Sequence, residues 1–306
     1  MSTLALPERF IRIQEELYGE QGRDWLANLP NLIDECAQRW SLQVQPAFGE
    51  LSYNYVAPAT RADGAAVVLK LGVPNKELSS EIAALRLYGG RSICQLVADD
   101  AERGALVIER LQPGVMLATL TDDEAATRIA AEVMRQLWRP APADHPFPTT
   151  AQWAKGLDRL RIEFGGGAGP FPPKLVEQAE SLYSELLASA GEPVLLHGDL
   201  HHFNILSAER APWLAIDPKG VVGEPAYEIG AFLRNPDLAQ YTPGELKMLQ
   251  ARRVDLFSAA LNLDRKRILG WAMAQAVLSA WWSYEDHGHG WEPAIQLAEL
   301  FASLAG

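Results

Sequence analysis

The order of the predicted secondary-structure elements constrains the fold of this chain more than any other feature of the sequence. Between residues 42 and 111, short segments rich in Val, Tyr and Leu are separated by Gly, Pro and Asp, and they predict antiparallel strands. One helix is predicted among them, at 76–88. Nearly every later pattern has helical spacing. Strands around a single helix, followed by a long run of helices, favour an α+β fold.

The same patterns divide the chain into two lobes. We expect an N-terminal lobe at 1–110, with a helical extension at 1–41 before the sheet, and a larger helical C-terminal lobe at 111–306. Strands are predicted at 44–48, 51–59, 65–72, 93–99 and 104–111. Helices are predicted at 7–18, 22–40, 122–138, 151–164, 174–190, 225–234, 243–261, 265–285 and 293–304. The sequence leaves open whether the extension braces the small lobe or pairs with another subunit.

Composition excludes several classes of function. Acidic residues number 39 and basic residues 27, a net charge of −12 that argues against nucleic acid as the main partner. The chain has only 2 cysteines, which excludes a disulfide-built secreted domain and a thiolate zinc site. No leader pattern and no long apolar run is visible, so we expect a cytoplasmic protein without a membrane partner. The oligomeric state, monomer or dimer, stays open.

One loop-rich island interrupts the helices and carries the polar residues with chemical potential. The segment His-Gly-Asp-Leu-His-His-Phe-Asn occupies 197–204, and Asp217 follows in Leu-Ala-Ile-Asp-Pro-Lys-Gly. Earlier in the chain, Lys70 lies in an apolar strand and Glu81 in the helix after it. Phosphoryl transfer from a nucleotide needs this kind of set: a carboxylate at the acceptor hydroxyl, oxygen ligands for Mg²⁺ and a cation at the phosphates.

This combination resembles the protein-kinase-like phosphotransferases, and among them the aminoglycoside phosphotransferases. The resemblance extends over roughly 42–306. The segments LHGDLHHFNIL, AIDPKG, GEPAYEIG and FLRNP are most similar to the streptomycin 6-kinase and hydroxyurea phosphotransferase subgroup. The implied fold has two lobes, a small N-lobe with an antiparallel sheet and a larger, mainly helical C-lobe. The implied cofactors are ATP, with GTP not excluded, and Mg²⁺.

The resemblance assigns roles to the polar residues of the island. Asp199 would orient the acceptor hydroxyl and take its proton, while Asn204 and Asp217 would hold Mg²⁺. His197 and His201 would support the loop. His202 and these two histidines could suggest a zinc cluster, but without cysteine, and with acids available for magnesium, we do not expect one.

Nucleotide contacts are expected from the first lobe. Lys70 would bind the α- and β-phosphates, and Glu81 would pair with it, with Glu77 as the competing acid. The segment around Ser52 occupies the place of the family's phosphate-covering loop, although a plain β-turn fits it equally well. The carbonyl of Glu109 and the amide of Leu111 would dock adenine.

Acceptor contacts are expected from the C-terminal lobe and would suit a small, cationic substrate. Trp281 and Glu285 share a helix face, where an aromatic side chain beside an acid could hold a guanidinium or ammonium group. Glu224 and Glu228 could also approach the acceptor, because they follow Asp217 closely in the chain. The alternative is that the tryptophans belong to the core, which is favoured for Trp271.

The sequence therefore predicts an ATP- and Mg²⁺-dependent phosphotransferase that acts on a small-molecule hydroxyl. By resemblance, the acceptor is streptomycin at its 6-hydroxyl, or hydroxyurea, and the result is antibiotic inactivation. A kinase of an endogenous sugar or amino alcohol is the alternative, and a non-catalytic nucleotide-binding protein is a third reading. A protein kinase is disfavoured, because Asp217 is followed by Pro-Lys-Gly and no Ala-Pro-Glu segment occurs.

Overall fold

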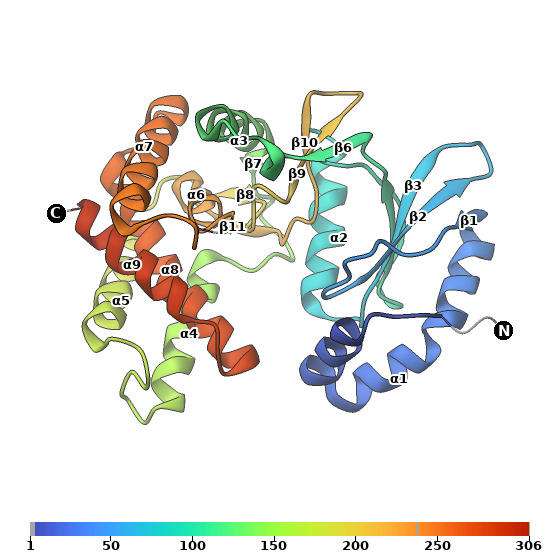
Figure 1. Cartoon of the computed structure of the whole chain (residues 1–306), viewed down its shortest axis with the longest axis horizontal. Helices are drawn as coiled ribbons and strands as arrows, with labels where there is room; N and C mark the ends of the chain where they lie inside the picture. The colour runs from blue at the N-terminus through green and yellow to red at the C-terminus, as the bar shows by residue number, and fades with distance from the viewer. Residues whose placement is uncertain (1–3, 237, 306) are drawn as a thin grey trace. The chain divides into compact units, whose positions relative to one another are not determined.

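The computed structural model describes residues 4–236 and 238–305. The chain divides into two units at the junction of Gly114 and Val115. Figure 1 shows strands concentrated in the N-terminal unit and helices in the C-terminal unit. The predicted α+β class, with an antiparallel sheet followed by a mainly helical remainder, is confirmed.

The N-terminal unit is built on a five-stranded antiparallel sheet with the order β1-β2-β3-β5-β4. Its strands are β1 (Leu42–Val44), β2 (Tyr55–Arg61), β3 (Ala66–Leu71), β4 (Leu96–Asp100) and β5 (Ala105–Glu109). The central strand β3 is almost wholly buried, in agreement with its run of branched apolar residues. One expectation was wrong: β2 begins only at Tyr55, so much of the segment predicted as strand before it is a loop.

Helix α2 (Lys76–Tyr88) follows β3 and has clear signals at both ends. The side chain of Asn75 accepts a hydrogen bond from the amide of Leu78 at 2.8 Å and so caps the first turn. Gly89 ends the helix in the left-handed region, with φ of 58°, where a residue without a Cβ is favoured. These two caps fix the position of α2 along the chain, and with it the position of Glu81.

Helix α1 (Glu8–Trp40) answers the question that the sequence left open about the extension. It breaks at Gly19, whose φ of 56° and ψ of −123° are not helical, so it consists of two helical segments as predicted. Phe10, Trp25 and Leu29 join the buried cluster that also holds Tyr55 and the apolar side chains of β3. The extension therefore braces the small sheet.

The C-terminal unit is organised around the long helix α8 (Arg265–His287), which is buried over most of its length. Against it pack α4 (Thr150–Glu163), α5 (Pro173–Ala188), α6 (Pro225–Leu233), α7 (Pro243–Leu261) and α9 (Glu292–Ala305) (Figure 1). Helix α3 (Asp123–Leu137), preceded by the short 3₁₀ helix η1 (Leu117–Thr119), packs against α7. Of the short strands, β6 (Pro113–Met116) and β7 (Arg139–Pro140) were not predicted, because brief strands containing proline have almost no periodicity to detect.

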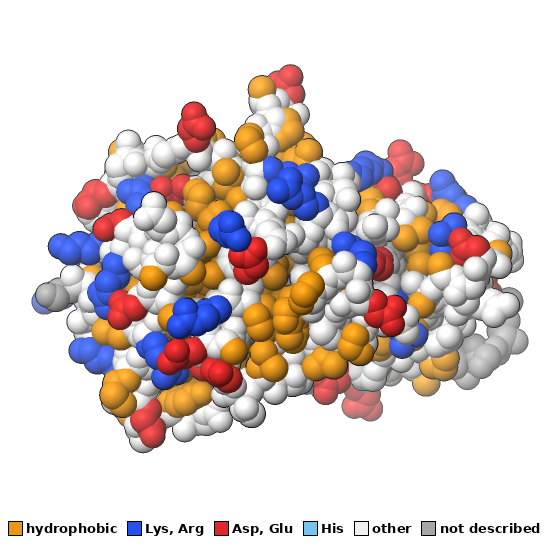
Figure 2. Space-filling model, turned by 90° about the horizontal axis from the view of Figure 1, so that it is seen from above, with side chains coloured by type: hydrophobic (Ala, Val, Ile, Leu, Met, Phe, Trp, Pro, Cys, Tyr) orange, Lys and Arg blue, Asp and Glu red, His pale blue; other side chains and the backbone are white. Residues whose placement is uncertain are grey.

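The surface carries both signs of charge. Figure 2 shows Lys and Arg side chains intermingled with Asp and Glu side chains on the face in view, with hydrophobic side chains exposed between them. On this face, the mixed charge forms no continuous basic stripe. Among the described residues, no helix has the length and apolar character needed to cross a membrane.

Candidate active site

Lys70 and Glu81 form a buried ion pair inside the N-terminal unit. Lys70 lies one residue before the end of β3, paired with Val56 on one side and Leu106 on the other. Its Nζ lies 2.7 Å and 2.9 Å from the two carboxylate oxygens of Glu81, on α2. Both side chains are less than a tenth exposed. The contact predicted from the sequence is thus present, and it holds the ammonium group at a defined place on the sheet.

In the C-terminal unit, two nested strand pairs bring the two polar loops of the island together. The outer pair joins β8 (Val194–Leu196) to β11 (Val221–Gly223), and the inner pair joins β9 (Ile205–Ala208) to β10 (Trp213–Ala215). The loop at 197–204, which we call the catalytic-loop candidate, connects β8 to β9. The segment that contains Asp217 connects β10 to β11. Because both loops connect the same two strand pairs, their residues must lie side by side.

His197 ties these two loops together. Its backbone carbonyl accepts hydrogen bonds from the amides of Lys219 and Gly220 at 2.8 Å and 3.1 Å. Its ring Nε2 lies 2.7 Å from the carbonyl of Ile216, which can only accept, so Nε2 carries the proton. Nδ1 is then free to accept from the amide of Asp199 at 3.3 Å. Burial lowers the pKa of His197 to about 4, which keeps this neutral tautomer at neutral pH.

Glu228, on α6, holds the start of the catalytic-loop candidate from the other side. One carboxylate oxygen accepts from the amide of His197 at 2.7 Å and the other from the amide of Gly198 at 2.8 Å. Gly198 has a φ of 86°, and a Cβ there would lie 3.0 Å from side-chain atoms of Trp153 and Val221. Burial raises the pKa of Glu228 to about 7, against the opposing effect of the two amide hydrogen bonds.

Asp199 is placed as an ionised carboxylate. Burial alone would raise its pKa, but the side-chain interaction with His201 and the positive charge of Arg234 lower the pKa below its ordinary value. The Oδ2 atom of Asp199 lies 3.6 Å from Nε2 of His201, and its side chain is 36% exposed. It is therefore both charged at neutral pH and accessible to a reactant. Arg234, in the segment FLRNP, was not singled out as a site residue.

Asn204 and Asp217 present oxygen ligands on the two adjacent loops. The Asn204 side-chain nitrogen donates to the carbonyl of Asp199 at 3.0 Å, which fixes the amide orientation. Its Oδ1 accepts no hydrogen bond within 4–236 and 238–305. Asp217 has a φ of 59°, in the left-handed region, just after β10. Carboxylate and amide oxygens are the donors that Mg²⁺ prefers, so this pair fits the metal implied by the family.

The other residues expected to bind the nucleotide belong to the N-terminal unit. Ser52 is exposed in the loop before β2, and Glu109 ends β5. The amide of Leu111 donates no hydrogen bond to any residue that the structure describes. A backbone donor without a protein acceptor is the feature that docking of adenine at this point would require.

The structure corrects the expected roles of Glu224 and Glu228 at the acceptor. Glu224 is 7% exposed and accepts from Arg267 Nε at 2.6 Å and 2.8 Å as well as from the Trp271 indole. Glu228 is engaged with backbone amides, as described above. Both carboxylates are thus internal supports, and closeness in sequence to Asp217 could not reveal which way they point.

The structure also gives Trp281 and Glu285 other roles than the expected contact with a cationic acceptor. Trp281 is 3% exposed and packs against the rings of Phe164, Phe171 and Tyr284, so it belongs to the core. Glu285 forms an ion pair with Arg159, with two hydrogen bonds at 2.6 Å and 2.7 Å. A cationic acceptor would have to compete with this arginine for the carboxylate.

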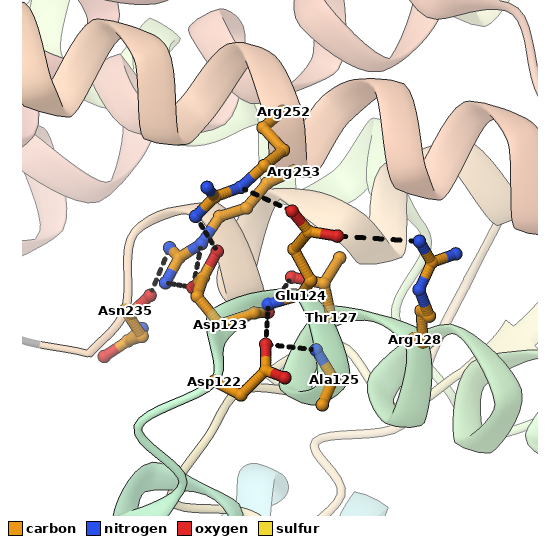
Figure 3. A network of polar contacts seen from close by, with 9 residues as sticks. All are labelled: Asp122, Asp123, Glu124, Ala125, Thr127, Arg128, Asn235, Arg252 and Arg253. Carbon is orange, nitrogen blue, oxygen red and sulfur yellow. Dashed lines mark hydrogen bonds and ion pairs between the residues drawn. The ribbon is translucent and has the colours of Figure 1, made fainter.

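A polar network that the sequence analysis missed joins the start of α3 to α7 and to Asn235 (Figure 3). Arg253, on α7, donates from Nε and Nη2 to Asp123 at 2.8 Å and 2.6 Å, and from Nη1 to the carbonyl of Asn235 at 2.8 Å. Its guanidinium also lies over the ring of Phe232, 5.3 Å from the centroid. The ring of His202 stacks on Phe232 at 3.8 Å. The network therefore connects α3 and α7 to the loop that carries Asp199.

Comparison with known proteins shows which family the sequence matches. Residues 39–287 match the family described as "Aminoglycoside/hydroxyurea antibiotic resistance kinase". The chain is 32% identical to streptomycin 6-kinase of Streptomyces glaucescens, with 96% of each sequence covered. It is also 32% identical to hydroxyurea phosphotransferase of Kitasatospora aureofaciens, over 100% of this chain and 88% of that protein.

A solved structure confirms the protein-kinase-like fold. A thermostable mutant of the aminoglycoside phosphotransferase APH(4)-Ia, in a ternary complex with ADP and hygromycin B, superposes with a TM-score of 0.62. The match covers 89% of this chain and 97% of that chain, at 14% sequence identity. At this identity the likeness is one of fold.

The buried pair behind the loop gives a prediction about stability. Replacing Asp123 by Asn leaves the guanidinium of Arg253, which is 2% exposed, without its carboxylate. We expect the free energy of unfolding to fall by about 3 kcal/mol, because breaking one half of a buried pair leaves an uncompensated charge. Asp255→Asn is the matched control, since its pair with Arg265 is exposed and should contribute at most about 1 kcal/mol. Equal losses in the two variants, measured by urea unfolding, would contradict this interpretation.

Glu228 gives a prediction about pH. Its pKa of about 7 in the folded chain exceeds the ordinary glutamate value of about 4.3 in the unfolded chain. Between these values the folded state keeps a proton that the unfolded state has lost, so the contribution of Glu228 to stability falls as pH rises, by at most about 1.4 kcal/mol per pH unit. Glu228→Gln should remove this contribution, whereas Glu299→Gln, at an exposed position, should not. Urea unfolding from about pH 5 to about pH 8 measures the pH dependence of the free energy of unfolding. The same pH dependence in Glu228→Gln as in the unaltered chain would refute the prediction.

Proposed function

Because the chain belongs to the family of aminoglycoside/hydroxyurea antibiotic resistance kinases, we propose that it transfers the γ-phosphoryl group of ATP to a hydroxyl of a small molecule. The acceptor we propose is a streptomycin-type aminoglycoside, at its 6-hydroxyl, or hydroxyurea. The observation that carries the proposal is the placement of Asp199, Asn204 and Asp217 on two adjacent loops joined through His197.

Asp199 is the proposed acceptor of the substrate proton. Its pKa lies below the ordinary value, so the side chain is a carboxylate at neutral pH and can accept a hydrogen bond from the hydroxyl. As the hydroxyl oxygen forms its bond to the γ-phosphorus, the bond from phosphorus to the β,γ-bridging oxygen breaks. ADP leaves with that oxygen, and the hydroxyl proton passes to Asp199.

Asn204 and Asp217 are the proposed ligands of Mg²⁺. When bound, the ion would neutralise negative charge on the phosphate oxygens. Asn204 contributes through Oδ1, because its side-chain nitrogen is held by the carbonyl of Asp199. The left-handed backbone at Asp217 turns the chain just after β10 and fixes the direction in which the side chain leaves the backbone.

Nucleotide binding is proposed for residues of the N-terminal unit. Lys70 would bind phosphate oxygens, with Glu81 holding its Nζ in place. The Leu111 amide and the Glu109 carbonyl would dock the adenine ring, and Ser52 would contact phosphate from the exposed loop before β2. ATP is the expected donor, and the geometry does not distinguish it from GTP.

Of the two proposed acceptors, charge favours the cationic one, the streptomycin-type aminoglycoside. The net charge of −12 favours a positively charged ligand over an anionic one. Phe203, which the sequence analysis did not select, exposes 43% of its surface on the same loop as Asp199. Its ring meets that of His201 edge to face at 5.8 Å. An exposed aromatic face near the proposed base could stack on a guanidinium group.

Turnover on a panel of acceptors tests this function. Purified protein is given ATP and Mg²⁺ with streptomycin, hydroxyurea, other aminoglycosides, common sugars and amino alcohols, and ADP release is measured. We expect turnover with streptomycin or hydroxyurea. Asp199→Asn should reduce it by about 10²–10⁴-fold, the range for loss of a general base, with ATP affinity unchanged.

The other outcomes are equally informative. Turnover only on a sugar or amino alcohol would keep the chemistry and replace the resistance role by a metabolic one. ATP binding without turnover on any acceptor would favour a nucleotide-binding protein. Normal turnover by Asp199→Asn would remove Asp199 from the mechanism.

A further inference from the structure

The first half of α1 contacts two parts of the proposed nucleotide site, although almost all of α1 lies before residue 39, where the family match begins. The first contact is made by Gln14. Its side chain is fully buried, and Nε2 donates a hydrogen bond to the backbone carbonyl of Tyr53 at 3.0 Å. Tyr53 follows Ser52 in the exposed loop before β2. A buried side chain of the extension thus holds the backbone of the loop proposed to cover phosphate.

The loop at 50–54 is also held at two further points, on either side of the residue that Gln14 contacts. Leu51 is 6% exposed and belongs to the buried cluster beneath the sheet. On the other side, the side chain of Asn54 packs closely against Gly72: a Cβ added to Gly72 would lie 2.2 Å from Oδ1 of Asn54. Gly72 directly follows β3, the strand that carries Lys70. Between these attachments, Ser52 and Tyr53 are exposed, so the bond from Gln14 acts at the accessible part of the loop.

Two glycines of α1 bring Gln14 to this position. The break at Gly19 turns the chain, so that residues of the second helical segment lie against residues of the first. A Cβ on Gly22 would lie 2.2 Å from the carbonyl oxygen of Gln14, so only glycine allows this approach. The rings of Phe10 and Trp25, one from each segment, meet edge to face at 6.2 Å. The position of Gln14 is therefore set by packing inside α1.

The second contact is made by Tyr18, one turn after Gln14. Its hydroxyl accepts a hydrogen bond from Nδ2 of Asn75 at 2.9 Å. Asn75 in turn caps α2 through its side-chain oxygen. Because Glu81 lies on α2 and pairs with Lys70, this contact acts on the start of the helix that holds the ammonium group. The first half of α1 therefore contacts both the loop and the cap of the helix that carries Glu81.

We propose that the first half of α1 is a positioning element for the nucleotide, with Gln14 fixing the loop at 50–54 and Tyr18 fixing the cap of α2. The inference rests on the proposed nucleotide site of this unit. It assigns Gln14 and Tyr18 to ATP affinity and not to the acceptor or to the transfer step. A loop held in its bound conformation before the ligand arrives loses less conformational entropy on binding.

Gln14→Met and Tyr18→Phe test this role, because each keeps the shape of the side chain and removes its hydrogen bond. The Oε1 atom of Gln14 is buried without a partner among the described residues, so methionine should cost the fold little or even stabilise it. We expect the Kd for ATP to rise by about three- to tenfold in each variant, the effect of losing one neutral hydrogen bond. The KM for the acceptor and kcat should each change by less than about twofold. The midpoint of thermal unfolding should change by no more than about a few degrees.

Backbone hydrogen exchange without nucleotide gives an independent readout. In Gln14→Met the amides of 50–54 should exchange faster than in the unaltered chain, because the loop opens more often. Gln21→Ala, at an exposed position of the same helix, is the matched control and should change neither exchange nor ATP affinity.

The outcomes separate this inference from the function on which it rests. Failure of the unaltered chain to bind ATP would overturn the proposed function and this inference together. ATP binding that is normal in both Gln14→Met and Tyr18→Phe would overturn the inference alone. A loss of kcat with unchanged ATP affinity would also contradict it, since it would point to the transfer step.

Discussion

The structure of the candidate site depends on one buried histidine. His197 accepts two amide hydrogen bonds through its carbonyl, donates from Nε2 to Ile216 and accepts from Asp199 at Nδ1. These bonds require a neutral ring with the proton on Nε2, and burial provides this by lowering the pKa of the ring to about 4. Because its partners come from both polar loops, this ring sets the place of Asp199 relative to Asp217. The chemistry proposed for the chain follows from that placement.

Around this histidine the fold supplies layers of support that have no contact with a substrate in the proposed mechanism. The nested strand pairs bring the loops together, and Glu228 accepts the amides where the first loop leaves β8. Farther away, the pair of Arg253 and Asp123 fixes Phe232, on which His202 stacks. The N-terminal unit uses the same principle, since α1 supports the loop and the helix cap from behind. A site for charged phosphates needs such rigidity, because small displacements weaken electrostatic stabilisation.

Much of this could be predicted from the sequence, for identifiable reasons. The strands and helices follow apolar periodicity, and the apolar run at 65–72 predicted the strand that carries Lys70, which pairs with Glu81 as expected. The acceptor residues could not be found this way. Glu224, Glu228 and Trp281 lie near the motif or share a helix face, but the direction of each side chain depends on partners distant in the chain, such as Arg267 for Glu224. The supporting role of Gln14 likewise depends on a bond to a residue 39 positions away.

The most direct test of this account is the rate of a single turnover in three variants of His197. Gln can place a nitrogen near the position of Nε2 and keep the bond to Ile216, Asn can mimic only Nδ1, and Leu keeps neither. With ATP bound equally well in all three, we predict a graded loss of phosphoryl transfer, smallest for His197→Gln and at least about 10²-fold for His197→Leu. Transfer at the full rate by a folded His197→Leu variant would contradict the claim that this ring positions the site.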